Sequence, residues 1–335
     1  MANVTYLLGA GASFERIPIV EDMANRISIV YSYFSHPSLK NLIGQKEEFS
    51  FSIRLEETIP EIIIDLLWMY EACLNHSSID TFAKKLYLTN QGEFLRLKRI
   101  LSFYFTFVQI EKTPDKRYDN FWASILSSKT SIPSSIKILS WNYDFQLEQS
   151  FINMSDSQNL RDARTKINMR NLEDPIVPGA GGSFGVLKLN GSAMFTDPLS
   201  NDEFYLCDYN HRVDFDTYRN ELIYRYGYAR KLDLSNTKLR FAWESEDIQG
   251  NSLVSQLFLN RTEVLAIIGY SFPFFNREID KTLFSSMPNL QKIYIQDPYA
   301  NDIKERLVEI IPENTDFKLI TGCKQFVFPK ELEII

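Results

Sequence analysis

The sequence predicts an α/β fold: a Rossmann-like, mostly parallel sheet with helices on both faces and a large helical insertion after the first strand. Several short apolar runs are each followed by small or polar residues, which is typical of strands buried on both faces of a sheet. A long segment with apolar residues at helical spacing separates the first two runs. The 335 residues, 44% of them hydrophobic, can fill a substantial core. We therefore expect a single domain over residues 1–335, with residues 20–130 as the mostly helical insertion.

The first predicted strand is Val4–Leu8, and it leads directly into the turn Gly9-Ala10-Gly11-Ala12-Ser13. A final strand with a short tail is expected over Phe317–Phe328. The strands predicted between these two share the short, nearly continuous apolar pattern, and they are Ile136–Trp141, Phe184–Leu189, Val264–Ile268 and Ile293–Ile295.

Helices are predicted in the insertion over Glu61–Leu74, Ile79–Leu88 and Phe94–Phe107. The aromatic residues Phe103 and Phe107 lie four apart, so they could form a stacking platform, but a packed core explains this spacing better. The glycines and prolines of residues 172–183 predict a loop. Residues 196–255 have no clean periodicity, and no element is predicted there.

Composition limits the partners and the metal chemistry. The net charge of −7 and the lack of a Lys/Arg block argue against direct nucleic-acid binding. Cys73, Cys207 and Cys323 are far apart and form no Cys-x-x-Cys pair, which excludes a zinc ribbon and argues against a disulfide framework. With only three scattered histidines, we expect no metal. Neither a membrane span nor a signal peptide is predicted, so we expect a cytoplasmic protein.

Polar residues follow the predicted strands. Gly9–Ser13 lacks large side chains, so its backbone N–H groups could approach a pyrophosphate, although a tight turn needs glycine for geometric reasons as well. Three later strands end in Ser140-Trp141-Asn142-Tyr143-Asp144, Lys188-Leu189-Asn190-Gly191-Ser192 and Gly269-Tyr270-Ser271-Phe272-Pro273. Open α/β sheets bind ligands at the carboxyl ends of their strands, so these segments are the candidate site.

Taken in order, these motifs resemble the sirtuin-like family, and specifically its bacterial branch of NAD⁺ hydrolases in antiphage defence. Gly-Ala-Gly-Ala-Ser, Asn-Tyr-Asp and Gly-Tyr-Ser-Phe-Pro stand here unaltered, and Ser78-Ile79-Asp80-Thr81-Phe82 resembles a segment of that branch's helical insertion. The resemblance spans essentially the whole chain. It implies cleavage of NAD⁺ to nicotinamide and ADP-ribose by a homo-oligomer, or with a partner protein of a defence system.

The resemblance also implies residue roles. Asn142 would bind the nicotinamide ribose and help to position a water, and Asp144 would face the carboxamide. Asp144 could instead cap a helix, and Ser271 could be a turn residue before Pro273. The other implied NAD⁺ contacts are Gly9, Ala10, Gly11, Ala12 and Ser13 for the pyrophosphate, Pro18 in a closing loop, Gly191 in the third motif, Gly269 and Ser271 for the phosphate or adenosine ribose, and Gln296 and Asp297 near the adenosine.

The third motif departs from the family at one position, because Asn190 stands where the family has its catalytic histidine. A carboxamide has no useful basicity near neutral pH, whereas hydrolysis requires a group that accepts a proton. Three explanations stay open. The protein could bind NAD⁺ or an ADP-ribose-like ligand without cleaving it, the substitution could be a designed one, or another base could act, the candidates being Glu15, Asp144, Asp208 and His211.

Among functions, NAD⁺ hydrolysis is the leading hypothesis. Sirtuin deacetylases carry a four-cysteine zinc module, which this chain lacks, so removal of acyl groups from lysine is disfavoured. Asn190 favours the alternative of a nucleotide-binding scaffold or regulatory subunit, whereas the intact Asn142 and Asp144 favour an enzyme. A different nucleotide ligand on the same fold is a third possibility.

Overall fold

The computed structural model describes residues 2–39, 53–110, 113–126, 133–172, 185–196, 203–204, 214–232, 237–244, 258–311 and 314–332. The chain divides into two compact units, each described by itself below. Unit 1 comprises Met1–Phe14, Pro114–Gly191 and Arg240–Ile335, and unit 2 comprises Glu15–Thr113 and Ser192–Leu239.

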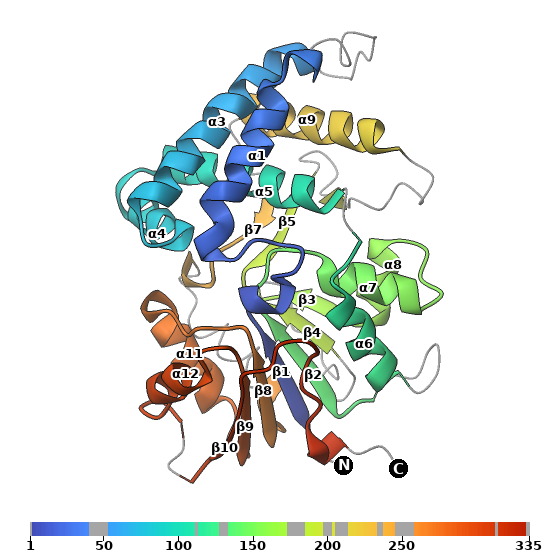
Figure 1. Cartoon of the computed structure of the whole chain (residues 1–335), viewed down its shortest axis with the longest axis vertical. Helices are drawn as coiled ribbons and strands as arrows, with labels where there is room; N and C mark the ends of the chain where they lie inside the picture. The colour runs from blue at the N-terminus through green and yellow to red at the C-terminus, as the bar shows by residue number, and fades with distance from the viewer. Residues whose placement is uncertain are drawn as a thin grey trace. The chain divides into compact units, whose positions relative to one another are not determined.

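Unit 1 is built on a seven-stranded sheet in the order β10-β9-β8-β1-β2-β4-β3 (Figure 1). Every strand pairing in this sheet is parallel, so the predicted Rossmann-like α/β fold is confirmed. The strands are β1 (Val4–Leu8), β2 (Ile136–Ser140), β3 (Met169–Asn171), β4 (Gly185–Lys188), β8 (Val264–Ile268), β9 (Lys292–Gln296) and β10 (Asp316–Ile320).

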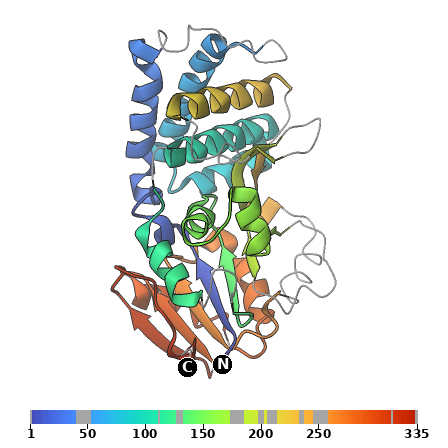
Figure 2. The ribbon, with the colours of Figure 1, turned by 90° about the vertical axis from the view of Figure 1, so that its right-hand side faces the viewer.

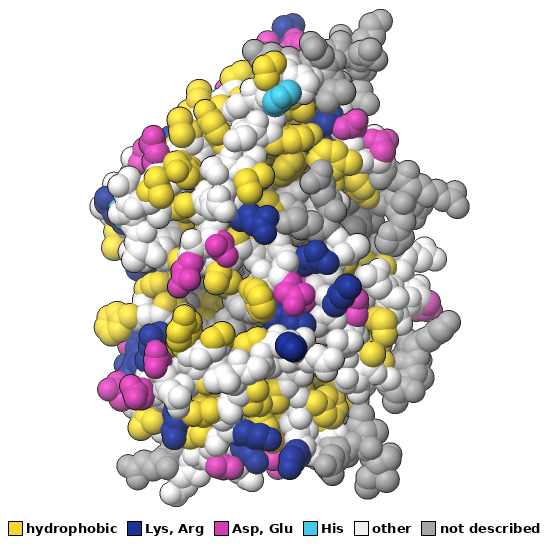
Figure 3. All heavy atoms as spheres, in the orientation of Figure 1, with side chains coloured by type: hydrophobic (Ala, Val, Ile, Leu, Met, Phe, Trp, Pro, Cys, Tyr) yellow, Lys and Arg dark blue, Asp and Glu magenta, His cyan; other side chains and the backbone are white. Residues whose placement is uncertain are grey.

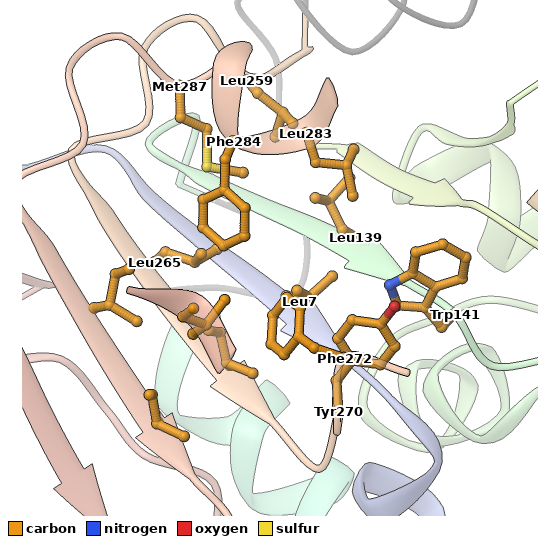
Figure 4. Close-up of a cluster of buried hydrophobic side chains, with 14 of the residues drawn as sticks. Leu7, Leu139, Trp141, Leu259, Leu265, Tyr270, Phe272, Leu283, Phe284 and Met287 are labelled. Atoms are coloured by element: carbon orange, nitrogen blue, oxygen red, sulfur yellow. The ribbon is translucent and has the colours of Figure 1, made fainter. Parts of the chain in front are cut away.

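Helices cover both faces of this sheet. Neighbouring residues of a strand point to opposite faces, so the contacts of Tyr6 and Leu7 in β1 show what packs on each side. On one side Leu7 joins a buried cluster with Leu283 and Phe284 of α11 (Figure 4), and on the other Tyr6 packs edge-on against Phe121 of α6, with ring centroids 4.9 Å apart. The helices of unit 1 are α6 (Lys116–Ile125), α7 (Gln146–Met154), α8 (Leu160–Lys166), α11 (Arg277–Ser285) and α12 (Ala300–Leu307), with short 3-10 turns at η1 (Ala10–Ser13), η5 (Ala242–Glu244), η6 (Phe274–Asn276) and η7 (Lys330–Leu332).

Unit 2 is mainly helical (Figures 1 and 2). Its core includes Phe34, which lies 5.3 Å from Phe103 and 4.9 Å from Phe107 between ring centroids, so the prediction of a packed aromatic core is confirmed. The elements are η2 (Val20–Asp22), α1 (Met23–Ser35), α3 (Leu55–Asn75), α4 (Ile79–Thr89), α5 (Gln91–Ile110), α9 (Phe215–Lys231) and a three-stranded sheet β6-β5-β7, made of β5 (Gly191–Thr196), β6 (Glu203–Phe204) and β7 (Thr237–Leu239).

The three helices predicted in the insertion lie within α3, α4 and α5. The prediction of a last strand as far as Phe328 was too long, because β10 ends at Ile320. Beyond it, the Gln296 side chain donates to the carbonyl oxygens of Gly322 and Gln325, and these side-chain bonds take the place of a strand ladder. Phe184, expected to begin the strand observed as β4, lies outside the described residues.

The chain passes between the units at four points: Phe14/Glu15, Thr113/Pro114, Gly191/Ser192 and Leu239/Arg240. Within unit 1, each return is bonded to the preceding departure. The Arg117 guanidinium donates to the Gly11 and Ala12 carbonyl oxygens, and the Arg240 N–H donates to the Asn190 carbonyl oxygen at 3.0 Å.

On the surface face drawn in Figure 3, basic and acidic side chains are interspersed among the described residues. None of the helices in the described part of the chain is long and apolar enough to cross a membrane.

Candidate functional site

Four of the predicted strand ends meet in unit 1. Strands β8, β1, β2 and β4 are consecutive neighbours in the parallel sheet, so their carboxyl ends lie along one edge. The segments that follow these strands begin at Gly269, Gly9, Trp141 and Leu189. In open parallel sheets this edge is where ligands bind, and here it carries the predicted site residues of unit 1.

The loops after β1 and β8 touch through their glycines. A Cβ atom on Gly9 would lie 2.5 Å from the Gly269 carbonyl oxygen, and one on Gly11 would lie 2.7 Å from the Gly269 Cα. Gly269 itself has a φ of 61°, in the left-handed region that favours glycine. The packing of the two loops therefore accounts for these glycines without any ligand.

The backbone N–H groups of the β1 loop are largely used within the protein. The Gly9 N–H donates to the Ile268 carbonyl oxygen and the Gly11 N–H to that of Gly269, each at 3.0 Å, while the Ala12 N–H donates to the Gly9 carbonyl oxygen at 2.8 Å. Among the described residues, the N–H of Ala10 has no hydrogen-bond partner, and Ala10 is exposed. Ala10 is thus better placed to donate to a phosphate than Gly9, Gly11 or Ala12.

A hydrogen-bonded cluster joins the ends of β1 and β2. The fully buried Ser13 Oγ lies 3.2 Å from the Asn142 Nδ2 and 3.0 Å from the Tyr118 hydroxyl, and it also bonds the Asp144 carboxylate. Asn142 can only donate through Nδ2, so Ser13 accepts that bond and can donate its own proton to Asp144. This cluster fixes the amide orientation of Asn142.

Asp144 binds the start of α7 and also has a shifted pKa. Its Oδ1 accepts from the N–H of Gln146, the first residue of α7, at 3.0 Å, so the helix-capping interpretation also has support. Burial raises the pKa of Asp144 above its ordinary value, while the Lys188 cation and the hydrogen bonds from Gln146 and Ser13 offset part of that rise. A carboxylate with a raised pKa is a stronger base than an ordinary one.

Asn190 is buried at the end of β4, next to the same cluster. Its Nδ2 donates to the Trp141 carbonyl oxygen at 3.2 Å and lies 3.5 Å from the Tyr143 hydroxyl. Trp141 in turn stacks on Tyr270, with ring centroids 5.2 Å apart and nearly parallel planes (Figure 4). The amide of Asn190 therefore acts as a donor that ties the β4 end to the β2 end.

Sequence reasoning missed a group of buried charges behind this edge. Glu148 lies 3.4 Å from both the Lys188 Nζ and the Arg164 guanidinium, and all three side chains are almost completely buried. The Lys188 Nζ also donates to the Asp144 carbonyl oxygen. Burial lowers the pKa of Lys188, and the nearby Glu148 and Asp144 partly counteract this. A lysine within an otherwise apolar strand was the signal in the sequence that could have revealed this network.

Arg117 and Tyr118 were missed as well. Both lie on α6 and both contact the loop after β1: Arg117 through backbone carbonyl oxygens and Tyr118 through the Ser13 hydroxyl. They follow Ser13 by about a hundred positions, so no local motif links them to the loop.

The residues expected near the adenosine have mixed surroundings. The exposed Ser271 accepts a bond at its carbonyl oxygen from Arg306 at 2.6 Å, which fits a turn residue. Gln296 is fully engaged by backbone groups after β10. Asp297 stays partly exposed, accepts from the Tyr299 N–H at 2.8 Å and has a pKa raised by burial.

The remaining predicted residues lie elsewhere. Pro18 and Glu15 belong to unit 2, whereas this site is described within unit 1. Asp208 and His211 lie outside the described residues. In the part of the chain that the structure describes, no three His, Cys, Asp or Glu side chains are grouped so that they could hold a metal ion. Comparison of the sequence with known proteins finds no matching family model and no curated protein of significant similarity.

Proposed function

We propose that the chain binds NAD⁺ at the carboxyl edge of the unit 1 sheet and hydrolyses its nicotinamide–ribose bond. The hydrogen-bonded cluster of Ser13, Asn142 and Asp144 carries this proposal. With its Nδ2 bonded to Ser13, Asn142 presents an Oδ1 that has no partner among the described residues, so this oxygen can accept from a ribose hydroxyl or a water.

The proposed reaction uses the chain's own groups. Nicotinamide leaves with the electrons of the glycosidic bond, and water adds to the cation-like ribose carbon. The proton lost by the water passes to a base, giving ADP-ribose. Asp144 is the candidate base in unit 1, since burial raises its pKa and Ser13 holds its carboxylate beside Asn142. A role in antiphage defence, with an oligomer or a partner protein, rests on the sequence resemblance alone.

The second candidate function is binding of NAD⁺ or an ADP-ribose-like nucleotide without cleavage. The observation in its favour is Asn190, which donates its amide protons to Trp141 and Tyr143 and has no basic nitrogen. A histidine at the same position could donate one ring N–H to the Trp141 carbonyl oxygen and keep the other nitrogen as a base.

The test is incubation of the purified chain with NAD⁺, with nicotinamide and ADP-ribose followed by chromatography and NAD⁺ binding followed by calorimetry. Asn142→Ala and Asn190→His are measured in parallel. We expect Asn142→Ala to abolish nicotinamide release, and Asn190→His to raise the rate by about 10²–10⁴-fold, the usual contribution of a general base.

Each outcome has a distinct meaning. Turnover by the unaltered chain but not by Asn142→Ala supports the hydrolase with a base other than histidine. Turnover by Asn190→His alone supports the binding-only candidate, with a site that lacks only its base. If neither the unaltered chain nor Asn190→His binds NAD⁺, both candidate functions are wrong.

A further inference from the structure

Arg117, a residue of α6 with no implied role, contacts the loop after β1 through several groups. Its guanidinium donates to the Ala12 carbonyl oxygen at 2.9 Å and to that of Gly11 at 3.3 Å, and it lies 4.3 Å from the centroid of the Phe14 ring. Asp115 accepts from the Nε and from a terminal nitrogen of the same guanidinium. Arg117 is only 2% exposed, so these contacts hold a buried fork.

This arrangement suits positioning rather than direct ligand binding. Asp115 balances the charge of Arg117. The Nη1 atom of the guanidinium donates to the Gly11 carbonyl oxygen and, at 3.5 Å, to that of Cys323. A trans peptide points its C=O and N–H in opposite directions. Arg117 draws the Gly11 and Ala12 carbonyl oxygens toward α6. These two oxygen atoms, which would repel a phosphate, therefore point away from the opposite side of the loop.

The next residue of α6 contacts a different part of the site. The Tyr118 hydroxyl lies 3.0 Å from Ser13 Oγ, which receives the Asn142 amide. Its ring is fully buried and packs edge-on against Phe326, with centroids 4.9 Å apart, so the hydroxyl is held in place independently of Ser13. Adjacent residues of one helix thus support the backbone of the loop and the Ser13–Asn142 bond separately.

We propose that Arg117 and Tyr118 are positioning residues with separable effects: Arg117 shapes the loop for the diphosphate of the nucleotide, and Tyr118 orients Asn142, through Ser13, for the adjoining ribose. This inference rests on the proposed nucleotide binding. In this inference α6, the first helix after the chain returns from unit 2, becomes part of the site, although no motif includes a residue of α6.

The test compares ADP, which has the diphosphate but not the second ribose, with ADP-ribose, by calorimetry on the full chain. We expect Arg117→Lys, which keeps the positive charge beside Asp115 but lacks the fork, to weaken both ligands about tenfold. We expect Tyr118→Phe, which removes one hydroxyl from a buried ring, to weaken ADP-ribose about fivefold and ADP less than twofold. Arg219→Lys is the matched control, because Arg219 is also a buried arginine paired with a carboxylate, that of Asp216, and it belongs to unit 2.

A purely structural effect of these changes would lower the melting temperature and weaken both ligands by the same factor in Arg117→Lys and Tyr118→Phe, and Arg219→Lys would weaken them too. That result overturns the proposal while leaving nucleotide binding intact, as does unchanged affinity in Arg117→Lys and Tyr118→Phe. If Arg117→Lys does not fold, the ratio of ADP-ribose to ADP affinity in Tyr118→Phe decides. Failure of the unaltered chain to bind either ligand overturns the proposed function and, with it, this inference.

Discussion

The Ser13 hydroxyl lies 3.2 Å from the Asn142 side-chain nitrogen, and this bond links residues at the ends of two adjacent strands, 129 positions apart in the sequence. Because Ser13 takes the amide hydrogen, the Asn142 carbonyl oxygen is the atom left for a ligand. The orientation of one amide therefore depends on a serine that the sequence assigns to a phosphate-binding loop.

Ser13→Ala removes the acceptor that orients Asn142. We expect NAD⁺ affinity to fall about five- to tenfold, the size expected for one or two lost hydrogen bonds, as measured by calorimetry. Ser150→Ala is a matched control, since Ser150 is also fully buried in unit 1 and donates to Asp119 at 2.6 Å. Equal affinities for the two variants would contradict a specific role for Ser13.

Gly269→Ala tests the packing of the loops after β1 and β8. The new Cβ atom would lie 2.4 Å from the Gly11 Cα, on a backbone whose φ is 61°. We expect the free energy of unfolding to fall by at least about 2 kcal/mol, because both the clash and the left-handed conformation penalise alanine. Urea unfolding gives the value. Gly322→Ala, whose Cβ would meet nothing within 4 Å, should stay within about 0.5 kcal/mol of the unaltered chain, and a similar loss in both variants would show the packing argument to be wrong.

Asp280 should make stability depend on pH. Burial raises its pKa to about 8, although bonds from Tyr270 and the charge of Arg277 lower it in part. An unfolded aspartate titrates near its ordinary pKa of 3.8, so between that pH and about 8 the folded chain holds a proton that the unfolded chain has lost. The stabilising contribution is complete below the unfolded pKa and is lost as pH rises through this window, at up to about 1.4 kcal/mol per pH unit.

Asp280→Asn should remove that dependence, because an amide keeps a similar shape and does not ionise. Urea unfolding between about pH 5 and 8.5 should give a flatter profile for the variant than for the unaltered chain. Parallel profiles would indicate that Asp280 titrates near its ordinary value in the folded protein.

Lys188→Met tests the buried charges behind the site. The change leaves Glu148 with Arg164 as its remaining ionic partner and removes the donor to the Asp144 carbonyl oxygen. We expect a loss of about 3 kcal/mol in the free energy of unfolding, because the buried Glu148 carboxylate loses one of the two cations that neutralise it. Adding Glu148→Gln to Lys188→Met should restore part of that loss, and a strictly additive double variant would exclude coupling between the two groups.

Most strands of unit 1 were predictable, because a strand such as Val264–Ile268 is apolar throughout and its flanking residues are not. The helix α9 was not, since the residues that it buries include Arg219 and three tyrosines, Tyr224, Tyr226 and Tyr228, so the sequence shows no apolar stripe. Tertiary packing of this kind overrides local pattern.

For the site, the same limit holds. Ser13, Asn142 and Asp144 were found because each directly follows a strand or its turn, where chain order alone predicts their edge of the sheet. Arg117, Tyr118 and Glu148 reach the site from helices, and only the packing of α6 and α7 against the sheet brings them there.

Unit 2 is made of two separate segments, Glu15–Thr113 and Ser192–Leu239, that are inserted into the sequence of unit 1. Arg117 bonds to the loop that precedes the first inserted segment, and the Arg240 N–H bonds to Asn190, which precedes the second. A short linker could therefore replace each inserted segment. The shortened gene would encode a minimal parallel-sheet protein of Met1–Phe14, Pro114–Gly191 and Arg240–Ile335, and the ligand affinity of that miniature would measure how much of the site the host supplies by itself.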